Sequence, residues 1–200
     1  MKSFFKQFSD SAKELKSIKC LAVTGLFVAI SMIIEGFAID IGFAKLNFAF
    51  LAIAVIGMLF GPSVAFLAGL ACDIVGYIAH PDGGFLPAYV LVAGVQGVIY
   101  GICLYRKFGR TDAKILCIRA TAARLLDVII INLIVNTALN MHYGFIPAES
   151  FGVAIASRTL KNVIELAADL PLLFLLLPLC LTAYKRTSTG RASVQPKAEI

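Results

Sequence analysis

The feature that most restricts the fold is an apolar stretch too long for a single membrane helix. Residues 48–72 contain no charged side chain. A straight helix from Phe48 to Ala79 would be about 48 Å long at 1.5 Å per residue, whereas the hydrocarbon core of a bilayer is about 30 Å thick. Gly61-Pro62 lies within the stretch, and such a pair is typical of a helix break. We therefore predict two spans joined by a tight turn.

The rest of the chain has the same apolar character. Hydrophobic residues make up 60% of it and charged residues only 15%, against about 25% charged residues in a soluble domain. This composition predicts an all-α membrane protein with six transmembrane helices in a lipid bilayer. The predicted spans are 19–39, 46–60, 63–80, 86–105, 118–141 and 152–183.

The positions of lysine and arginine predict the direction of these spans. Basic residues cluster before residue 20, between 106 and 119, and after 184, and such clusters prefer the cytoplasmic side. Six spans place all three clusters on one side, whereas merging the second and third spans would separate them. We therefore expect both termini in the cytoplasm. The net charge of +6 is explained by this topology, without a nucleic-acid partner.

Three regions follow from this topology. Residues 1–18 are expected to form an amphipathic cytoplasmic N-terminal segment, 19–185 the six-helix transmembrane domain, and 186–200 a disordered cytoplasmic tail. The sequence contains no Walker loop, HExxH motif or nucleophile constellation, and none of its five cysteines forms a CxxC pair. We expect no enzymatic activity, cofactor or metal site. The chain supplies no ATP chemistry of its own, so any energy would come from an ion gradient or from another subunit.

Polar residues within the spans are the candidate ligand-binding groups, because burying them in a membrane is costly. In the last span, residues 158, 161, 162, 165 and 169 fall on one helical face. Arg124 and Asp127 are expected to form an ion pair. The amides of the fifth span either join helices or bind a ligand, and both readings stay open at this stage. The candidates are Asn132, Asn136, Arg158, Lys161 and Asn162, with Lys45 and Asn47 at the start of the second span.

Two further sets of residues are candidates for contacts. Phe85 and Tyr89, in and after a turn-rich loop on the outer side, could cover a flat ring or simply mark the membrane interface. Ala22, Gly25 and Ala29 share one face of the first span, and small residues allow another helix to approach closely. We predict a partner-docking surface there.

Several short motifs occur in an order that resembles the substrate-binding S components of energy-coupling factor (ECF) vitamin transporters, and the folate group in particular. Together they cover roughly residues 20–180. The matching stretches are Phe43-Ala-Lys-Leu-Asn-Phe48, Ile56-Gly-Met-Leu-Phe-Gly-Pro62, Pro81-Asp-Gly-Gly-Phe-Leu-Pro87, Gly97-Val-Ile-Tyr-Gly101, Asn132-Leu-Ile-Val-Asn136 and Arg158-Thr-Leu-Lys-Asn162.

The resemblance implies a six-helix, multi-pass subunit of the bacterial cytoplasmic membrane that binds one vitamin from the outside, most simply folate. Such subunits work with a membrane coupling subunit and two ATPases. One departure affects the choice of ligand, because Glu35 aligns where folate-type members tend to carry an arginine. The alternatives are an S component for another vitamin or precursor, or a self-sufficient small secondary transporter with an ion pathway through its acidic residues.

Overall fold

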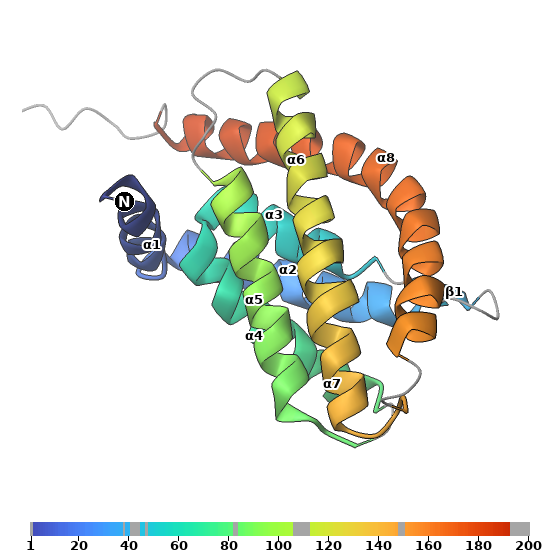
Figure 1. Ribbon diagram of the computed structural model, residues 1–200. Coiled ribbons are helices and arrows are strands. Elements are labelled where there is room, and N and C mark those ends of the chain that lie inside the picture. Colours follow the sequence, from blue (N-terminus) through green and yellow to red (C-terminus); the bar gives the residue numbers. More distant parts are fainter. Residues whose placement is uncertain are drawn as a thin grey trace, which may run out of the picture.

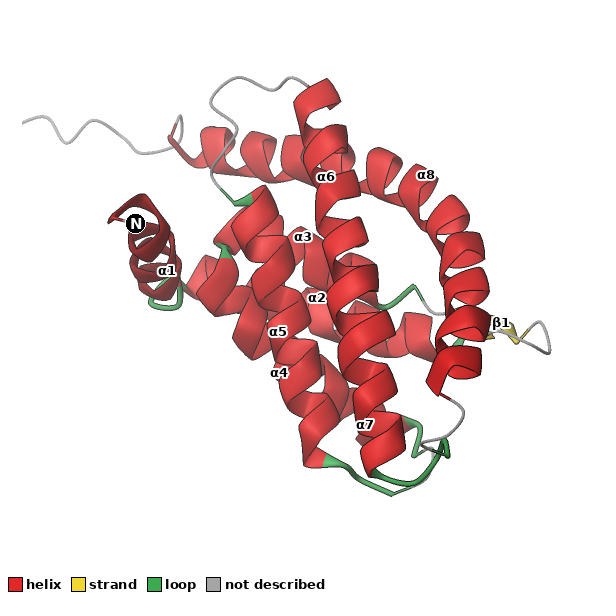
Figure 2. Ribbon diagram, in the orientation of Figure 1, coloured by secondary structure: helices red, strands yellow, loops and turns green. Residues whose placement is uncertain are grey.

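A computed structural model describes residues 2–37, 39–40, 45–46, 48–81, 84–105, 113–147 and 151–192 as a bundle that is almost entirely helical (Figures 1 and 2). Helices α6, η1 and α7 form one continuous rod (Figure 1). The elements are α1 (Lys2–Glu14), α2 (Ile18–Gly36), β1 (Ile39–Asp40), β2 (Lys45–Leu46), α3 (Phe50–Phe60), α4 (Pro62–Ala79), α5 (Pro87–Leu104), α6 (Ala113–Asp127), the π-helix η1 (Val128–Val135), α7 (Asn136–His142) and α8 (Phe151–Ala192).

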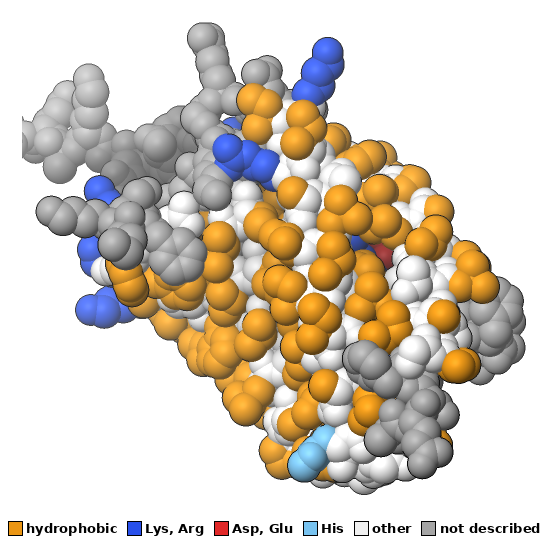
Figure 3. Space-filling model, viewed as in Figure 1, with side chains coloured by type: hydrophobic (Ala, Val, Ile, Leu, Met, Phe, Trp, Pro, Cys, Tyr) orange, Lys and Arg blue, Asp and Glu red, His pale blue; other side chains and the backbone are white. Residues whose placement is uncertain are grey.

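The predicted class, an all-α membrane protein, is confirmed. Five helical segments of the described chain are long and apolar enough to cross a membrane, with mean hydropathy between 1.6 and 2.1. The sixth apolar helix is the shorter α3. Large hydrophobic side chains such as Leu91, Leu175 and Leu179 are exposed, and orange side chains cover the middle of the face in Figure 3. An exposed apolar belt of this kind suits a lipid environment.

Helix α3 forms the centre of the bundle and contacts α2, α4, α5 and α8. Its residues Ala54, Val55 and Ile56 are fully buried. At 11 residues it is about 16 Å long, shorter than the predicted span 46–60, because Lys45–Leu46 pairs instead with Ile39–Asp40 as a short antiparallel hairpin. A short helix is tolerated here because protein, rather than lipid, surrounds it.

The predicted break at Gly61-Pro62 is confirmed. Gly61 has a φ of 88°, in a region that glycine adopts readily and L-residues avoid. Its missing side chain also makes room for Ser11 of α1, whose Oγ would lie 2.9 Å from an added Cβ. Ser11 Oγ accepts hydrogen bonds from the N–H groups of Ser63 and Val64 at 3.0 and 3.2 Å. It thereby caps the start of α4, where Gly61 has no side chain to do so.

Glycines bring α4 and α5 into close antiparallel contact. A side chain at Gly97 would collide with the backbone of Ala65, and one at Gly69 with the backbone of Ala93. Such small residues allow the two backbones to approach within a membrane, where dispersion forces must hold helices together. The close pair forms one wall of the site described below.

The last helix, α8, is the longest, with 42 residues, and contains Pro171 and Pro178. It curves around the bundle (Figure 1), as expected where prolines remove backbone N–H groups. The helix continues to Ala192, into the segment that the sequence predicts as a disordered tail. Within the helix, the hydroxyl of Thr187 donates a hydrogen bond to the carbonyl of Ala183. Residues 193–200 lie outside the described chain.

The helix ends gather into two groups. At one end, Lys19 at the start of α2 lies 4.1 Å from the ring centroid of Tyr184 in α8, which in turn packs edge-on against Phe60. We call this the basic end; lysine and arginine side chains occupy the corresponding region in Figure 3. At the opposite end, which we call the aromatic end, Tyr77 packs on Phe85 with ring centroids 5.2 Å apart. The cytoplasmic location of the basic end remains a prediction.

Cysteine labelling in intact cells tests this orientation. In a background without the five native cysteines, Gly84→Cys at the aromatic end should react with a membrane-impermeant reagent added outside. Lys13→Cys and Lys114→Cys should react only after the membrane is opened, because they lie with the basic clusters. Labelling of Gly84→Cys and Lys114→Cys from the same side would contradict the six-span topology.

Candidate functional site

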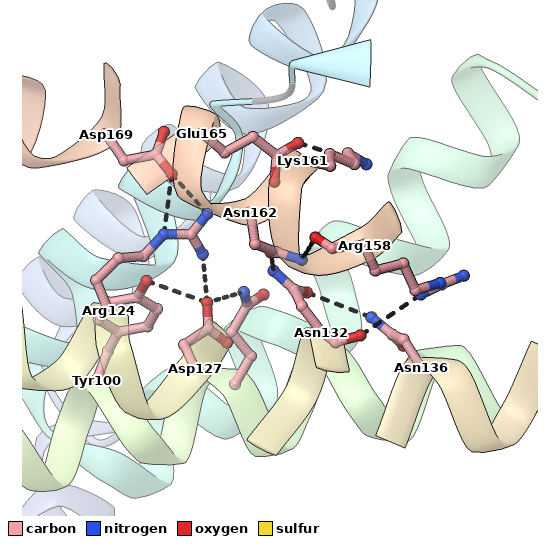
Figure 4. A network of polar contacts seen from close by, with 11 residues as sticks. Tyr100, Arg124, Asp127, Asn132, Asn136, Arg158, Lys161, Asn162, Glu165 and Asp169 are labelled. Atoms are coloured by element: carbon pink, nitrogen blue, oxygen red, sulfur yellow. Dashed lines mark hydrogen bonds and ion pairs between the residues drawn. The ribbon is translucent and has the colours of Figure 1, made fainter. Parts of the chain in front are cut away.

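The polar residues of the bundle interior lie mainly on two facing elements, α8 and the continuous helix α6–η1–α7 (Figure 4). The predicted polar face of α8 is present, because residues 158, 161, 162 and 165 line one cavity. Asp169, one helical turn further along the same face, is buried. These residues recur at helical spacing, so a single face of α8 carries them all. Three kinds of contact connect the two elements.

The first contact is a buried charge cluster. The guanidinium of Arg124 on α6 donates to Asp169 Oδ2 on α8 from Nε at 2.9 Å and from Nη2 at 2.6 Å. Its Nη1 donates to Asp127 Oδ2. All three residues are at least 96% buried. The predicted Arg124–Asp127 pair is therefore confirmed, and Asp169 is a second partner that links α6 to α8.

Neutral groups complete this cluster. Gln96 of α5 donates to Asp127 Oδ2 at 2.9 Å, and the hydroxyl of Tyr100 donates to the same oxygen at 3.3 Å. The ring of Phe50 covers the Arg124 guanidinium at 4.1 Å, a favourable cation–π geometry. These contacts compensate for the loss of hydration on burial. The cluster therefore joins α3, α5, α6 and α8.

The second contact is a chain of amides next to the cluster. Asn132 Nδ2 donates to Asn162 Oδ1 of α8 at 2.9 Å, and Asn136 Nδ2 reaches Asn132 Oδ1 at 3.4 Å. The buried Oδ1 of Asn136 has no hydrogen-bond partner within the described part of the chain. Asn132, Asn136 and Asn162 all line the same cavity. They join helices, as one reading of the sequence proposed, and they leave an acceptor for a ligand.

The third contact involves the cations of α8. Arg158 Nη1 donates to the main-chain carbonyl of Asn132 at 3.4 Å, and Lys161 Nζ lies 3.4 Å from Glu165 Oε1. A guanidinium has five N–H donors, so one hydrogen bond leaves Arg158 able to bind an anion as well. Charge-assisted hydrogen bonds of this kind are among the strongest in proteins.

These residues enclose an inner cavity of about 420 Å³, within the range typical of small-molecule sites. One wall is α8, and the opposite wall comes from α2, α4 and α5. Arg124 and Phe50 of the charge cluster also line it. The remaining lining residues are Ser31, Glu35, Ala49, Ile53, Cys72, Asp73, Ala93, Gln96, Asn132, Asn136, Arg158, Lys161, Asn162 and Glu165.

An outer cavity of about 580 Å³ continues from the inner one toward the aromatic end. The two share Glu35, Asp73, Asn136 and Arg158, so these residues mark the junction. The outer lining also includes several aromatic rings, which can cover or stack on a planar group. They come from α4, the loop before α5, α5 itself and the loop after α7, and are Tyr77, Phe85, Tyr89 and Phe145.

The structure brings most of the predicted binding residues together. Asn132, Asn136, Arg158, Lys161 and Asn162 line the inner cavity, and Phe85 and Tyr89 line the outer one. Asn47 and the side chain of Lys45 lie outside the described residues.

Sequence reasoning missed several residues of the cavities. Gln96 is the one amide of its span and could have been found from that isolation. Ser31, Tyr77 and Phe145 carry no such signal, since hydroxyls and aromatic rings are common in membrane helices and at their ends.

The predicted docking residues of α2 lie on the outside of the bundle. Ala22, Gly25 and Ala29 are exposed, and a side chain at Gly25 would meet nothing within 4 Å. The flanking Leu21 and Leu26 are 55% and 59% exposed. This face of α2 is therefore open to a neighbouring helix.

A polar cavity enclosed by membrane helices and open toward one end defines a class of protein: a membrane-embedded receptor for a small polar molecule. The family model described as "ECF transporter, substrate-specific component" matches residues 19–177. The chain therefore belongs to the substrate-specific components of ECF transporters, multi-pass membrane proteins that bind the substrate and work with an ECF module.

Two similar proteins give this result more detail. The chain is 27% identical over 151 residues to the folate transporter FolT of Clostridium novyi (strain NT), covering 75% of this chain and 83% of that protein. It also resembles the crystal structure of FolT bound with folic acid, with a TM-score of 0.67 and 28% identity, covering 79% of this chain and 93% of that one.

The buried charge cluster leads to a prediction about stability. Arg124→Ala should lower the free energy of unfolding by about 3–5 kcal/mol, because it leaves two buried carboxylates without their cation. Lys13→Ala is the matched control, since Lys13 pairs with Asp10 at the surface and such pairs contribute little. Denaturant titration in detergent micelles measures both. Equal stability of the two variants would contradict the assigned role of the cluster.

Proposed function

We propose that this chain is the folate-binding S component of an ECF transporter. The observation that carries the proposal is the inner cavity, which is lined by the remaining donors of Arg158 and by the acceptor of Asn136. The similarity of the chain to FolT over most of its length supports it. Folate carries a flat heteroaromatic ring with hydrogen-bonding edges and a carboxylate-bearing tail. Cations suit its carboxylates, amides suit ring edges, and the aromatic residues of the outer cavity suit its flat rings.

A second candidate ligand is favoured by the acidic residues at the junction. The Glu35 carboxylate lies against Gly76, one turn from Asp73 in α4. Carboxylates at this position favour a ligand that presents amino groups or a positive charge. An S component for a vitamin or precursor of that kind is the alternative. Titration with folic acid and with a panel of neutral and cationic vitamins distinguishes the two ligands.

The partners follow from the same proposal. A membrane coupling subunit and two ATPases would supply the energy, and the open face of α2 would dock the coupling subunit. In this arrangement the basic end and both termini face the cytoplasm, α1 rests on the inner membrane surface, and the aromatic end receives the ligand from outside. A self-sufficient secondary transporter would instead accumulate its ligand from a gradient alone, which vesicle uptake tests directly.

The cations of α8 provide the first test of the proposed ligand. Arg158→Ala and Lys161→Ala should each weaken folic acid binding about 10- to 100-fold, because each removes one hydrogen bond to a charged group. Thr159→Ala is the matched control, since Thr159 is exposed and bonds only within its own helix, to Ile155. Calorimetric titration of the purified protein measures all three. Parent-like affinity in both charge variants would refute the cavity assignment.

The α2 face provides a test of assembly. Gly25→Leu and Ala29→Leu should reduce co-purification of a coupling subunit and ATPases, because bulk prevents close helix approach. Folic acid binding by the isolated subunit should stay unchanged, since neither residue lines a cavity. Leu26→Ala, which removes bulk on the same exposed helix, is the control. Intact assembly in both leucine variants would place the docking surface elsewhere.

A further inference from the structure

The helix that faces α8 is interrupted by a π-helical segment beside the inner cavity. The sequence predicts one α-helix over 118–141, but the structure contains the eight-residue η1 between α6 and α7. The N–H of Asn136 bonds to the carbonyl of Ile131, five residues earlier. Segments of this kind are rare and often lie at functional sites.

This shift in hydrogen bonding changes the partner of one carbonyl. In an α-helix the N–H of residue 136 would bond to the carbonyl of residue 132. Here that N–H is directed to Ile131 instead, and the carbonyl of Asn132 accepts Nη1 of Arg158. Figure 4 shows Arg158 reaching from α8 to this helix. The π-turn and the position of Arg158 are thus connected through a single backbone group.

We propose that the π-turn of η1 positions Arg158 for the ligand by freeing the carbonyl of Asn132. The carbonyl holds the guanidinium at the junction of the inner and outer cavities, and the remaining donors of the guanidinium bind an anionic group of the ligand. A long side chain that is already fixed loses less conformational freedom when the ligand arrives, and affinity increases accordingly. This inference rests on the proposed function, because it requires a ligand in the cavity.

The spacing of the contacts with α8 shows how the π-turn can be removed while the other contacts between the two helices are kept. Arg124 and Asn132 both bond residues of α8 although they are eight residues apart, a separation that in an α-helix would place them about 80° apart around the axis. Deleting one residue between them makes the separation seven, which an ordinary α-helix places within about 20° of one face. Ile130 is 39% exposed and lines neither cavity, so it is the residue to delete.

The decisive variant is therefore a deletion of Ile130, with Ile130→Ala as its matched control. The deletion restores the α-helical bond between the N–H of Asn136 and the carbonyl of Asn132. Affinity for folic acid should fall about 10- to 100-fold, as expected for Arg158→Ala, whereas Ile130→Ala should bind like the parent. In the Arg158→Ala background the deletion should change affinity by less than about twofold, because both changes act through the same group.

Two results would overturn the inference while leaving the proposed function intact. One is parent-like affinity of the deletion variant when Arg158→Ala binds weakly. The other is an equal loss on deletion with and without Arg158, which shows that the effect does not pass through this side chain. If Arg158→Ala itself binds folic acid normally, the inference fails, whereas the cavity assignment fails only if Lys161→Ala also binds normally.

A second variant covers the case in which the deleted protein does not fold. Arg158→Lys keeps the charge but replaces the planar fork of donors with one compact ammonium group, which cannot hold the carbonyl and the ligand in the same way. Its affinity should be close to that of Arg158→Ala. Full affinity in Arg158→Lys would overturn the role of the carbonyl.

Discussion

The structure depends on one electrostatic constraint, that a cation buried among membrane helices must keep its counter-charges. Arg124 meets this requirement with Asp127 on its own helix and Asp169 on α8. Because an unpaired charge at this depth would cost several kcal/mol, the cluster fixes α8 against α6. Most of the amides and cations that line the inner cavity lie on α8 and on the continuous helix α6–η1–α7, so the cluster also determines the geometry of the site.

The opposite wall is held by a different force. Gly69 and Gly97 bring α4 and α5 together by shape alone, and the buried α3 fills the space between that pair and α8. The cavity lies between a wall fixed by charge and a wall fixed by close packing. This arrangement leaves polar groups such as Arg158 and Asn136 facing an enclosed space, where their interactions with a ligand are stronger than in water.

Much of this arrangement could be predicted from the sequence, because it depends on periodicity and charge. The six apolar segments, the break at Gly61 and the polar face of α8 all follow from local patterns. The pairing of Arg124 with Asp169 could not be predicted, since it joins residues 45 positions apart. The π-turn of η1 also escaped prediction, because VIIINLIV carries no local signal that separates a π-helix from an α-helix.

The central claim is that the cavity beside α8 holds a folate-like ligand through Arg158. Mass spectrometry of small molecules released from the protein, purified from cells grown with folic acid, tests it most directly. The account predicts that a folate is released from the parent protein in nearly equal molar amount and in much smaller amount from Arg158→Ala, while both remain folded. Release of a different vitamin, or equal release of folate from both proteins, would contradict it.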